Sequence, residues 1–150
     1  CLGVSDISDS YTGFIIGTWG VLHNGHHAHE SAIECLRELK ARNKYVMLLS
    51  NTEERADESA SALKGMGIDP GLYNSVITSG ELLWQGLKHQ NTDGFQNLGA
   101  SCYLIGGERT RNFLKSIPID VVTNIADASF LMIAGWDQLD MTPNAYDDIL

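Results

Sequence analysis

Residues 14–25 read FIIGTWGVLHNG, which is an apolar run, a glycine-rich bend and a short polar turn. The apolar residues 12–16 predict a buried β-strand, and residues 29–43 repeat apolar side chains at helical spacing. A strand followed by an amphipathic helix is typical of α/β proteins, whose ligands bind beyond the carboxyl ends of parallel strands. This strand gives out at Gly17, which has no side chain to carry out chemistry.

The alternation of strand and helix continues along the chain. Strands are predicted at residues 45–49 and 75–78, followed by helices at 51–67 and 80–90. Beyond the polar, glycine-bearing segment 91–101, the pattern predicts strands at 102–106, 119–122 and 128–135, a helix at 108–117, and a last helix opened by Thr142 and Pro143. The sequence therefore predicts an α/β fold with parallel strands, divided near residue 95 into a first domain, 1–95, and a second, 96–150.

The composition narrows the class of protein. Ten basic residues stand against nineteen acidic ones, and a formal charge of -9 repels nucleic-acid phosphates, so no nucleic acid is expected as a partner. No apolar run approaches the roughly 20 residues that a membrane helix needs, and no secretory leader is recognisable. The three cysteines fit neither a disulfide framework nor a zinc knuckle. These features predict a cytoplasmic protein with no membrane partner.

Polar residues follow the second predicted strand, namely Ser50, Asn51 and Thr52. They stand at the start of the predicted helix 51–67, where backbone N–H groups and the helix dipole favour an anion such as phosphate. The alternative is that Asn51 or Thr52 caps the helix and binds no ligand. Spacing alone favours the capping interpretation.

Four histidines crowd the stretch after the glycine-rich bend: His23, His26, His27 and His29. Imidazole groups bind zinc, nickel or copper, but no cysteine lies nearby, and Glu30 is the only neighbouring carboxylate. The dipeptide Asn24-Gly25 is typical of tight turns. The sequence therefore favours a turn over a metal site.

Four segments taken together resemble a known family: FIIGTWGVLHNG at 14–25, VMLLSNT at 46–52, GIDPGLYNSVITSGE at 67–81 and YLIGGERTR at 103–111. In this order and at these distances they are similar to the haloacid dehalogenase (HAD) superfamily. The most similar part is its class IIA phosphatase-like branch, whose first motif reads Asp-x-Trp-Gly-Val-Leu-His-Asn-Gly. The resemblance implies a Rossmann-like three-layer sandwich with a parallel sheet, followed from about residue 101 by the start of an inserted α/β cap domain.

The resemblance also implies a reaction. Members of this superfamily hydrolyse phosphate esters with magnesium and with an aspartate at the end of the first strand, which forms an aspartyl phosphate. By the register of the motif that aspartate belongs at position 17, where this chain has Gly17. The resemblance implies a magnesium-dependent phosphatase of small phosphorylated metabolites, and Gly17 predicts that the chain as given is inactive.

Other positions of the family's motifs are kept. Trp19 stands where many relatives have a second aspartate as general acid, and its backbone carbonyl is the one that usually reaches magnesium. Ser50 and Asn51 match the second motif, which holds the phosphate. The turn that flanks the family's site matches Gly20, His23 and Asn24. A loop near the junction of core and cap matches Ser79, Gly80 and Glu81.

Three hypotheses follow from these observations. The chain is a truncated or variant member of an enzymatic family, because the lysine of the third motif and the acidic magnesium ligands of the fourth lie beyond the cap. Alternatively, it is a non-catalytic pseudoenzyme that binds a phosphorylated ligand in a regulatory role. The third hypothesis is a fragment whose exposed sheet edge pairs with another chain, as in a homo-oligomer.

Overall fold

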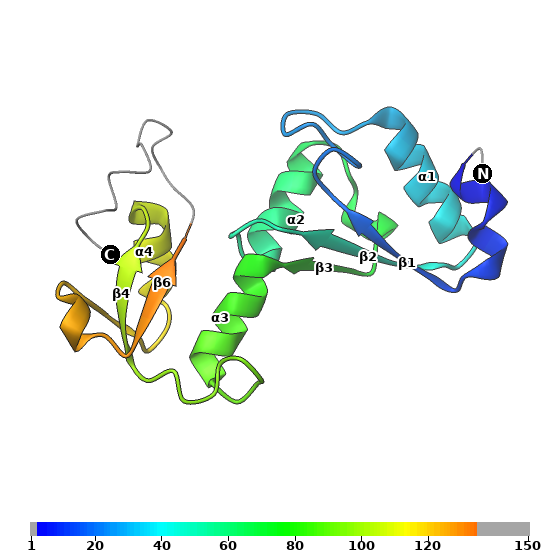
Figure 1. Ribbon diagram of the computed structural model, residues 1–150. Coiled ribbons are helices and arrows are strands. Elements are labelled where there is room, and N and C mark those ends of the chain that lie inside the picture. Colours follow the sequence, from blue (N-terminus) through cyan, green and yellow to red (C-terminus); the bar gives the residue numbers. More distant parts are fainter. Residues whose placement is uncertain (1–2, 135–150) are drawn as a thin grey trace. The chain divides into compact units, whose positions relative to one another are not determined.

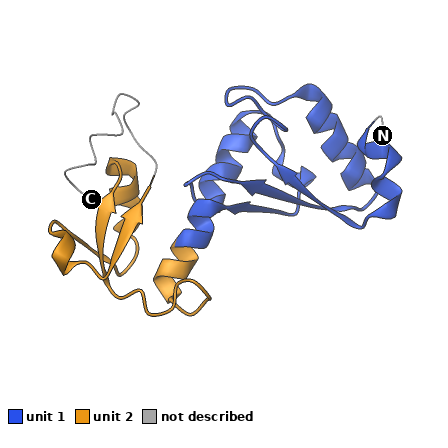
Figure 2. Ribbon diagram, viewed as in Figure 1, with its two compact units in different colours: residues 1–83 blue, residues 84–150 orange. Residues whose placement is uncertain are grey.

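The computed structural model describes residues 3–134 and forms two compact units, residues 1–83 and 84–150 (Figure 2). Each unit has its own parallel sheet, and helices connect the strands. The α/β fold predicted from the sequence is confirmed. The domain boundary predicted near residue 95 falls within the second unit and stays a prediction, as does the assignment of the later residues to a cap domain.

The first unit is built on three parallel strands in the order β1-β2-β3 (Figure 1). Strands and helices alternate as β1 (Gly13–Gly17), α1 (Glu30–Ala41), β2 (Tyr45–Ser50), α2 (Ala56–Gly65), β3 (Ser75–Thr78) and α3 (Ser79–His89), of which the residues from Trp84 on belong to the second unit. Short 3-10 helices precede β1 and β3: η1 (Val4–Asp6), η2 (Ser8–Ser10) and η3 (Pro70–Leu72). The parallel pairing brings the carboxyl ends of the strands to one edge of the sheet.

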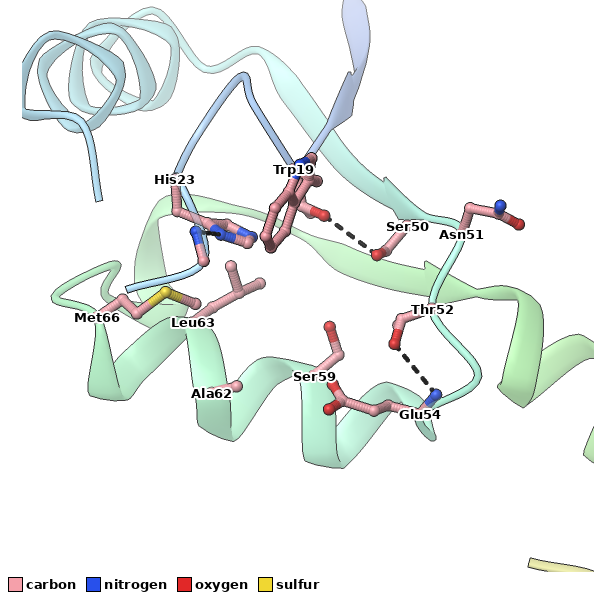
Figure 3. A pocket seen from close by; sticks show the side chains of 12 residues that line it. Trp19, His23, Ser50, Asn51, Thr52, Glu54, Ser59, Ala62, Leu63 and Met66 are labelled. Atoms are coloured by element: carbon pink, nitrogen blue, oxygen red, sulfur yellow. Dashed lines mark hydrogen bonds between the residues drawn. The ribbon is translucent and has the colours of Figure 1, made fainter. Parts of the chain in front are cut away.

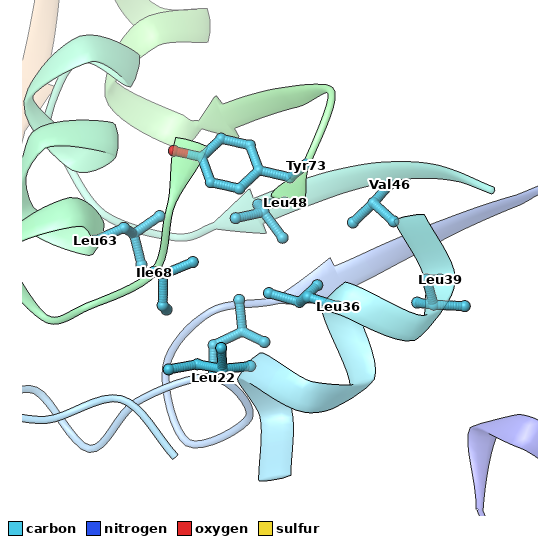
Figure 4. Close-up of a cluster of buried hydrophobic side chains, with 9 residues drawn as sticks. Leu22, Leu36, Leu39, Val46, Leu48, Leu63, Ile68 and Tyr73 are labelled. Carbon is cyan, nitrogen blue, oxygen red and sulfur yellow. The ribbon is translucent and has the colours of Figure 1, made fainter. Parts of the chain in front are cut away.

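The core of this unit lies against one face of the sheet (Figure 4). Val46 and Leu48 point into it from β2, and both are 0% exposed. Leu36 and Leu39 of α1 pack against them, together with Leu63 of α2. Helices α1 and α2 therefore cover the same face, and the apolar spacing predicted for residues 29–43 forms the buried side of α1.

The opposite face of the same sheet is apolar and exposed. Ile15 on β1 is 70% exposed and Leu49 on β2 is 47% exposed. Because successive side chains of a strand point to opposite faces, β1 alternates between exposed and half-buried residues. The prediction of a buried strand at residues 12–16 is therefore wrong for this face, since none of the described helices of this unit packs on it. The homo-oligomer predicted from an exposed sheet edge stays a prediction.

The second unit also has a three-stranded parallel sheet, but here the first strand along the chain is the central one. Its three parallel strands lie in the order β5-β4-β6. Along the chain the elements are β4 (Ser101–Ile105), α4 (Glu108–Leu114), β5 (Asp120–Val122), η4 (Ile125–Asp127) and β6 (Phe130–Ile133). Cys102 of the central strand is 0% exposed, and Leu114 of α4 is 1% exposed.

Two further predictions concern the last helix of the chain and membrane-spanning helices. The helix predicted to open at Thr142 and Pro143 lies outside the described residues. Of the helices found within residues 3–134, none combines the length and the apolar character needed to cross a membrane.

Candidate anion-binding site

A cavity of about 510 Å³ lies at the carboxyl ends of β1 and β2, between the turn that follows β1 and helix α2 (Figure 3). One part of its wall is polar and comes from the chain after β2 and from α2: Ser50, Asn51, Thr52, Glu54 and Ser59. Another part is largely apolar: Trp19, Ala62, Leu63 and Met66. The wall is completed by Thr18, His23 and Gly25.

The register of β1 and β2 brings the ends of these strands together at the cavity. Gly17 pairs with Leu49, so the residues that follow them, Thr18 and Ser50, lie next to each other. The hydroxyl of Thr18, which is 3% exposed, donates a hydrogen bond of 3.1 Å to Ser50 Oγ. Gly17 therefore lies beside the Ser50 corner, although it does not itself line the cavity.

Asn51 extends this corner towards β3. Its Oδ1 atom accepts a hydrogen bond of 2.9 Å from the hydroxyl of Ser79, the first residue of α3. The structure thus brings Ser50, Asn51 and Ser79 to one edge of the sheet. The binding of phosphate by Ser50 and Asn51 stays a prediction.

Helix α2 begins at Ala56, later than predicted, so neither Asn51 nor Thr52 caps it. The backbone N–H of Arg55 donates to Glu58 Oε2 at 2.9 Å, and that of Ala56 donates to Glu81 Oε2 at 3.4 Å. These carboxylates occupy the helix N-terminus, which a phosphate would otherwise use. The capping interpretation is therefore wrong, as is the start of the helix at residue 51, whereas an anion site at these residues stays a prediction.

The loop of residues 51–55 is instead held by the junction of β3 and α3. Arg55 Nε lies 2.6 Å from Glu81 Oε2, and the hydrogen bond to Glu81 raises the pKa of the Arg55 guanidinium. The Thr78 hydroxyl donates to the carbonyl oxygen of Glu54 at 2.6 Å. Gly80 is packed directly against the backbone of residues 53 and 54. Gly80 and Glu81 thus support this loop, whereas Ser79 contacts Asn51 at its start.

The turn predicted at Asn24-Gly25 is present. Asn24 Oδ1 accepts hydrogen bonds from the backbone N–H groups of His26, at 3.0 Å, and His27, at 2.9 Å. Gly20 and Gly25 take positive φ angles of 75° and 95°, which favour glycine. Within residues 3–134, no three His, Cys, Asp or Glu side chains gather where they could hold a metal ion. Asn24 therefore shapes the turn through its side chain.

His23 is the buried histidine of this turn, with 8% of its surface exposed. Its Nδ1 atom accepts a hydrogen bond of 3.0 Å from the backbone N–H of Gly25, which leaves the ring proton on Nε2. Burial lowers the pKa of His23, and the nearby charge of His29 lowers it further. His23 therefore serves the turn as a neutral imidazole.

Trp19 is 72% exposed, although it is one of the largest apolar side chains of the chain. Its ring meets His23 edge-to-face, with centroids 5.7 Å apart and planes at 87°. It also lies so close to Gly25 that a Cβ atom there would stand 2.6 Å from the ring. The indole is thus held over the turn while one side stays open.

Several residues of the cavity escaped the sequence analysis. Thr18 was not predicted as a site residue, because it holds the variable second position of the first motif. Ser59, Ala62 and Met66 come from α2, whose spacing indicated only an inward side and not what that side faces. The spacing of α2 together with the predicted crossover could have placed this helix beside the turn after β1.

Comparison with known proteins identifies the family of this chain. The model of the haloacid dehalogenase-like hydrolase family matches residues 14–120 of the 150-residue chain. The chain belongs to the haloacid dehalogenase-like hydrolase family. The membership predicted from the four sequence segments is confirmed, and the site described above is the part of a HAD-like fold that follows its first two strands.

Solved structures of HAD-like proteins share the fold. A haloacid dehalogenase-like hydrolase from Brucella suis 1330 is 22% identical, with a TM-score of 0.81 over 99% of this chain and 55% of its own. A 4-nitrophenylphosphatase from Thermotoga maritima is 19% identical, with a TM-score of 0.63 over 94% of this chain and 50% of its own. NagD from E. coli K-12 is 19% identical, with a TM-score of 0.61 over 92% and 52%.

The chain therefore spans about half the length of these three structures, from 50% to 55%. No curated protein matches it.

The packing of Gly80 against the loop of residues 51–55 can be tested by substitution. In Gly80→Ala the new Cβ would stand 2.6 Å from the Glu54 carbonyl oxygen, and closer still to that of Glu53. We expect a loss of about 2 kcal/mol or more in the free energy of unfolding, measured with urea. The matched control is Gly65→Ala at the end of α2, where nothing lies within 4 Å of the new Cβ. An equal loss in both variants would contradict the role of Gly80.

The lowered pKa of His23 predicts a pH dependence of stability. Below its ordinary value of 6.5 the unfolded chain takes up a proton that native His23 resists, so the free energy of unfolding falls as the pH drops. Between about pH 7.5 and about pH 5.5, the urea midpoint of wild type should therefore fall more than that of His23→Asn. The exposed His26→Asn variant is the control and should follow wild type. An unchanged pH slope in His23→Asn would refute this assignment.

Proposed function

We propose that this chain carries the phosphate-binding part of a HAD-family phosphatase, in which Ser50 and Asn51 hold the phosphate of a small phosphorylated metabolite. The single observation that supports this most is the corner beside the cavity, where Thr18 donates a hydrogen bond to Ser50 and Ser79 donates one to the neighbouring Asn51. The shared fold of a 4-nitrophenylphosphatase adds support, because that relative is named for the hydrolysis of a phosphate ester.

The hydrogen bonds of the corner leave donors for an anion. Ser50 Oγ accepts from Thr18, so the hydroxyl proton of Ser50 can be donated to a phosphate oxygen. Figure 3 shows the Asn51 side chain, whose Oδ1 accepts from Ser79, pointing away from Ser50, so the second donor is the backbone N–H of Asn51, as the resemblance to the second motif implies. A hydroxyl and an amide that both donate suit the oxygen atoms of a phosphate.

The chemistry of the family needs a carboxylate at position 17, and Gly17 has none. No covalent aspartyl phosphate can form on this residue. By analogy with the loss of nucleophiles in other enzymes, the change lowers turnover roughly a millionfold. The chain as given therefore binds a phosphate ester without hydrolysing it.

Magnesium is expected from the family, and the residues of this chain can be compared with what it needs. Carboxylate oxygens are the protein ligands that magnesium prefers. Gly17 offers none, and the described part of the chain has no group of three His, Cys, Asp or Glu side chains arranged for a metal. The backbone carbonyl of Trp19 alone does not make a site. The described residues do not fit magnesium, and the phosphate binding proposed here depends on hydrogen bonds.

The alternative is that phosphate binding is itself the function, as in a regulatory pseudoenzyme. The retained corner at Ser50 supports this alternative, because a site kept without its nucleophile can still report the presence of a ligand. Both proposals include the binding of phosphate. They differ in whether an aspartate at position 17 would restore hydrolysis.

Phosphate binding is tested first. Calorimetric titration of the chain with inorganic phosphate should show binding, and Ser50→Ala should weaken it about tenfold, because it removes a hydrogen bond to a charged group. Ser61→Ala on the exposed side of α2 is the control and should bind like wild type. Equal affinity in wild type and Ser50→Ala would remove Ser50 from the site.

The role of position 17 is tested by restoring the carboxylate. The nearest atom to a Cβ at this position is Val21 Cγ2 at 3.9 Å, so the Cβ of an added side chain meets no clash. In the full-length protein, Gly17→Asp should release phosphate from 4-nitrophenyl phosphate, whereas wild type and the near-isosteric Gly17→Asn should not. Phosphate release by wild type at the rate of Gly17→Asp would refute the proposed role. Silence of Gly17→Asp on a broad panel of phosphate esters would favour the pseudoenzyme.

A further inference from the structure

Helix α2 turns one side towards the cavity beside Ser50. Three residues of the helix and its C-cap residue line the cavity at helical spacing: Ser59, Ala62, Leu63 and Met66. Ser59 is the polar member of this group. Figure 3 shows its hydroxyl oxygen pointing away from the helix, on the side of Ser50 and Trp19.

The hydroxyl of Ser59 has no partner in the part of the chain that the structure describes. A serine inside a helix commonly donates to the carbonyl oxygen four residues earlier, as Ser61 does to that of Asp57 at 2.8 Å. Ser59 is only 6% exposed, yet its Oγ makes no hydrogen bond to any of the described residues. The buried hydroxyls of Thr18 and Thr78 each donate one. A buried hydroxyl without a partner costs free energy until water or a ligand pairs with it.

Two other hydroxyls without a partner do not indicate a ligand. The hydroxyl oxygen atoms of Tyr73 and Ser75 are enclosed by protein, and neither residue is among those that line this cavity. Ser59 does line the cavity, so a group of a bound molecule can reach its Oγ. The volume of about 510 Å³ leaves room for such a group beside a phosphate.

The surroundings of Ser59 restrict the group that can pair with it. The other side chains on this side of α2 are apolar, and a charged group would lose hydration beside them. None of the described residues that line the cavity is a lysine or an arginine, so a second anionic group would find no counter-charge there. A neutral hydroxyl suits this position, because it can both donate to Ser59 Oγ and accept from it.

We propose that Ser59 is a further ligand-binding residue of this cavity and pairs with an uncharged hydroxyl group that a bound phosphate ester carries beside its phosphate. The proposal rests on the phosphate binding proposed above and adds a determinant of specificity. The phosphate occupies the corner at Ser50 and Asn51, and the rest of the ester extends from it along α2. Ser59 thereby distinguishes a hydroxyalkyl phosphate from the alkyl phosphate of the same length.

The test compares phosphate esters that differ by one hydroxyl group. Calorimetric titration of the chain uses two pairs: 2-hydroxyethyl phosphate with ethyl phosphate, and 3-hydroxypropyl phosphate with propyl phosphate. The two pairs place the hydroxyl at different distances from the phosphate. In at least one pair, wild type should bind the hydroxyl-bearing ester about fivefold tighter, which is the effect expected of one neutral hydrogen bond.

Variants at position 59 assign this preference to the serine hydroxyl. Ser59→Ala should remove the preference while the affinities for inorganic phosphate and for the alkyl ester stay the same. Alanine is favourable inside a helix, so we expect this variant to fold, and circular dichroism checks that it does. Ser59→Cys offers only a weak hydrogen-bonding group and should also lose most of the preference. Ser61→Ala is the matched control on the same helix and should keep it.

The outcomes separate this proposal from the one it rests on. Equal binding within both pairs by wild type, or a preference that survives Ser59→Ala, would overturn the role of Ser59 and leave phosphate binding standing. An equal loss of affinity for both members of a pair in Ser59→Ala would place Ser59 with the phosphate and would overturn this role as well. Binding of no ester, nor of inorganic phosphate, by wild type would overturn both proposals.

Discussion

The site depends on the parallel register of β1 and β2. Pairing of Gly17 with Leu49 sets Thr18 next to Ser50, and a slip of one residue would turn Thr18 to the other face of the sheet. The hydrogen bond between these two hydroxyls is therefore a direct product of the register. Because Ser50 Oγ accepts this hydrogen bond, the hydroxyl proton of Ser50 is left for a ligand. The bond also holds the end of β1 close to Ser50.

A second constraint holds the loop that carries Asn51. The loop follows β2 without entering a helix, and its shape comes from β3 and α3, through the Arg55 to Glu81 ion pair and the glycine that lets α3 approach. The ion pair is about a quarter exposed on each side, 28% and 22%, so we attribute the loop's position to packing and hydrogen bonding more than to charge attraction. Gly17 takes no part in these supports, so the proposed phosphate binding does not depend on a carboxylate at position 17.

Much of the fold could be predicted from the sequence, because the period of its apolar residues changes between strand and helix. The buried side of α1 and the carboxyl-end location of Ser50 both follow from local pattern. The start of α2 was predicted too early, because the N–H of Ala56 is bound by Glu81, which is 25 residues away in sequence, while that of Arg55 is bound locally by Glu58. Ile15 is of a residue type that is usually buried. It is exposed because helices α1 and α2 both pack on the other face of the sheet. The contact of Trp19 with Gly25 likewise depends on the shape of the turn.

The central claim is that an anion binds at the end of β2 and not at the N-terminus of α2. The most direct measurement is a titration of the ¹⁵N-labelled chain with inorganic phosphate, followed by the amide shifts in NMR spectra. We predict that the largest shifts belong to residues 50–52 and Thr18 and that those of Ala56 and Asp57 stay small. Largest shifts at the start of α2, or at residues remote from the carboxyl ends of β1 and β2, would contradict the account.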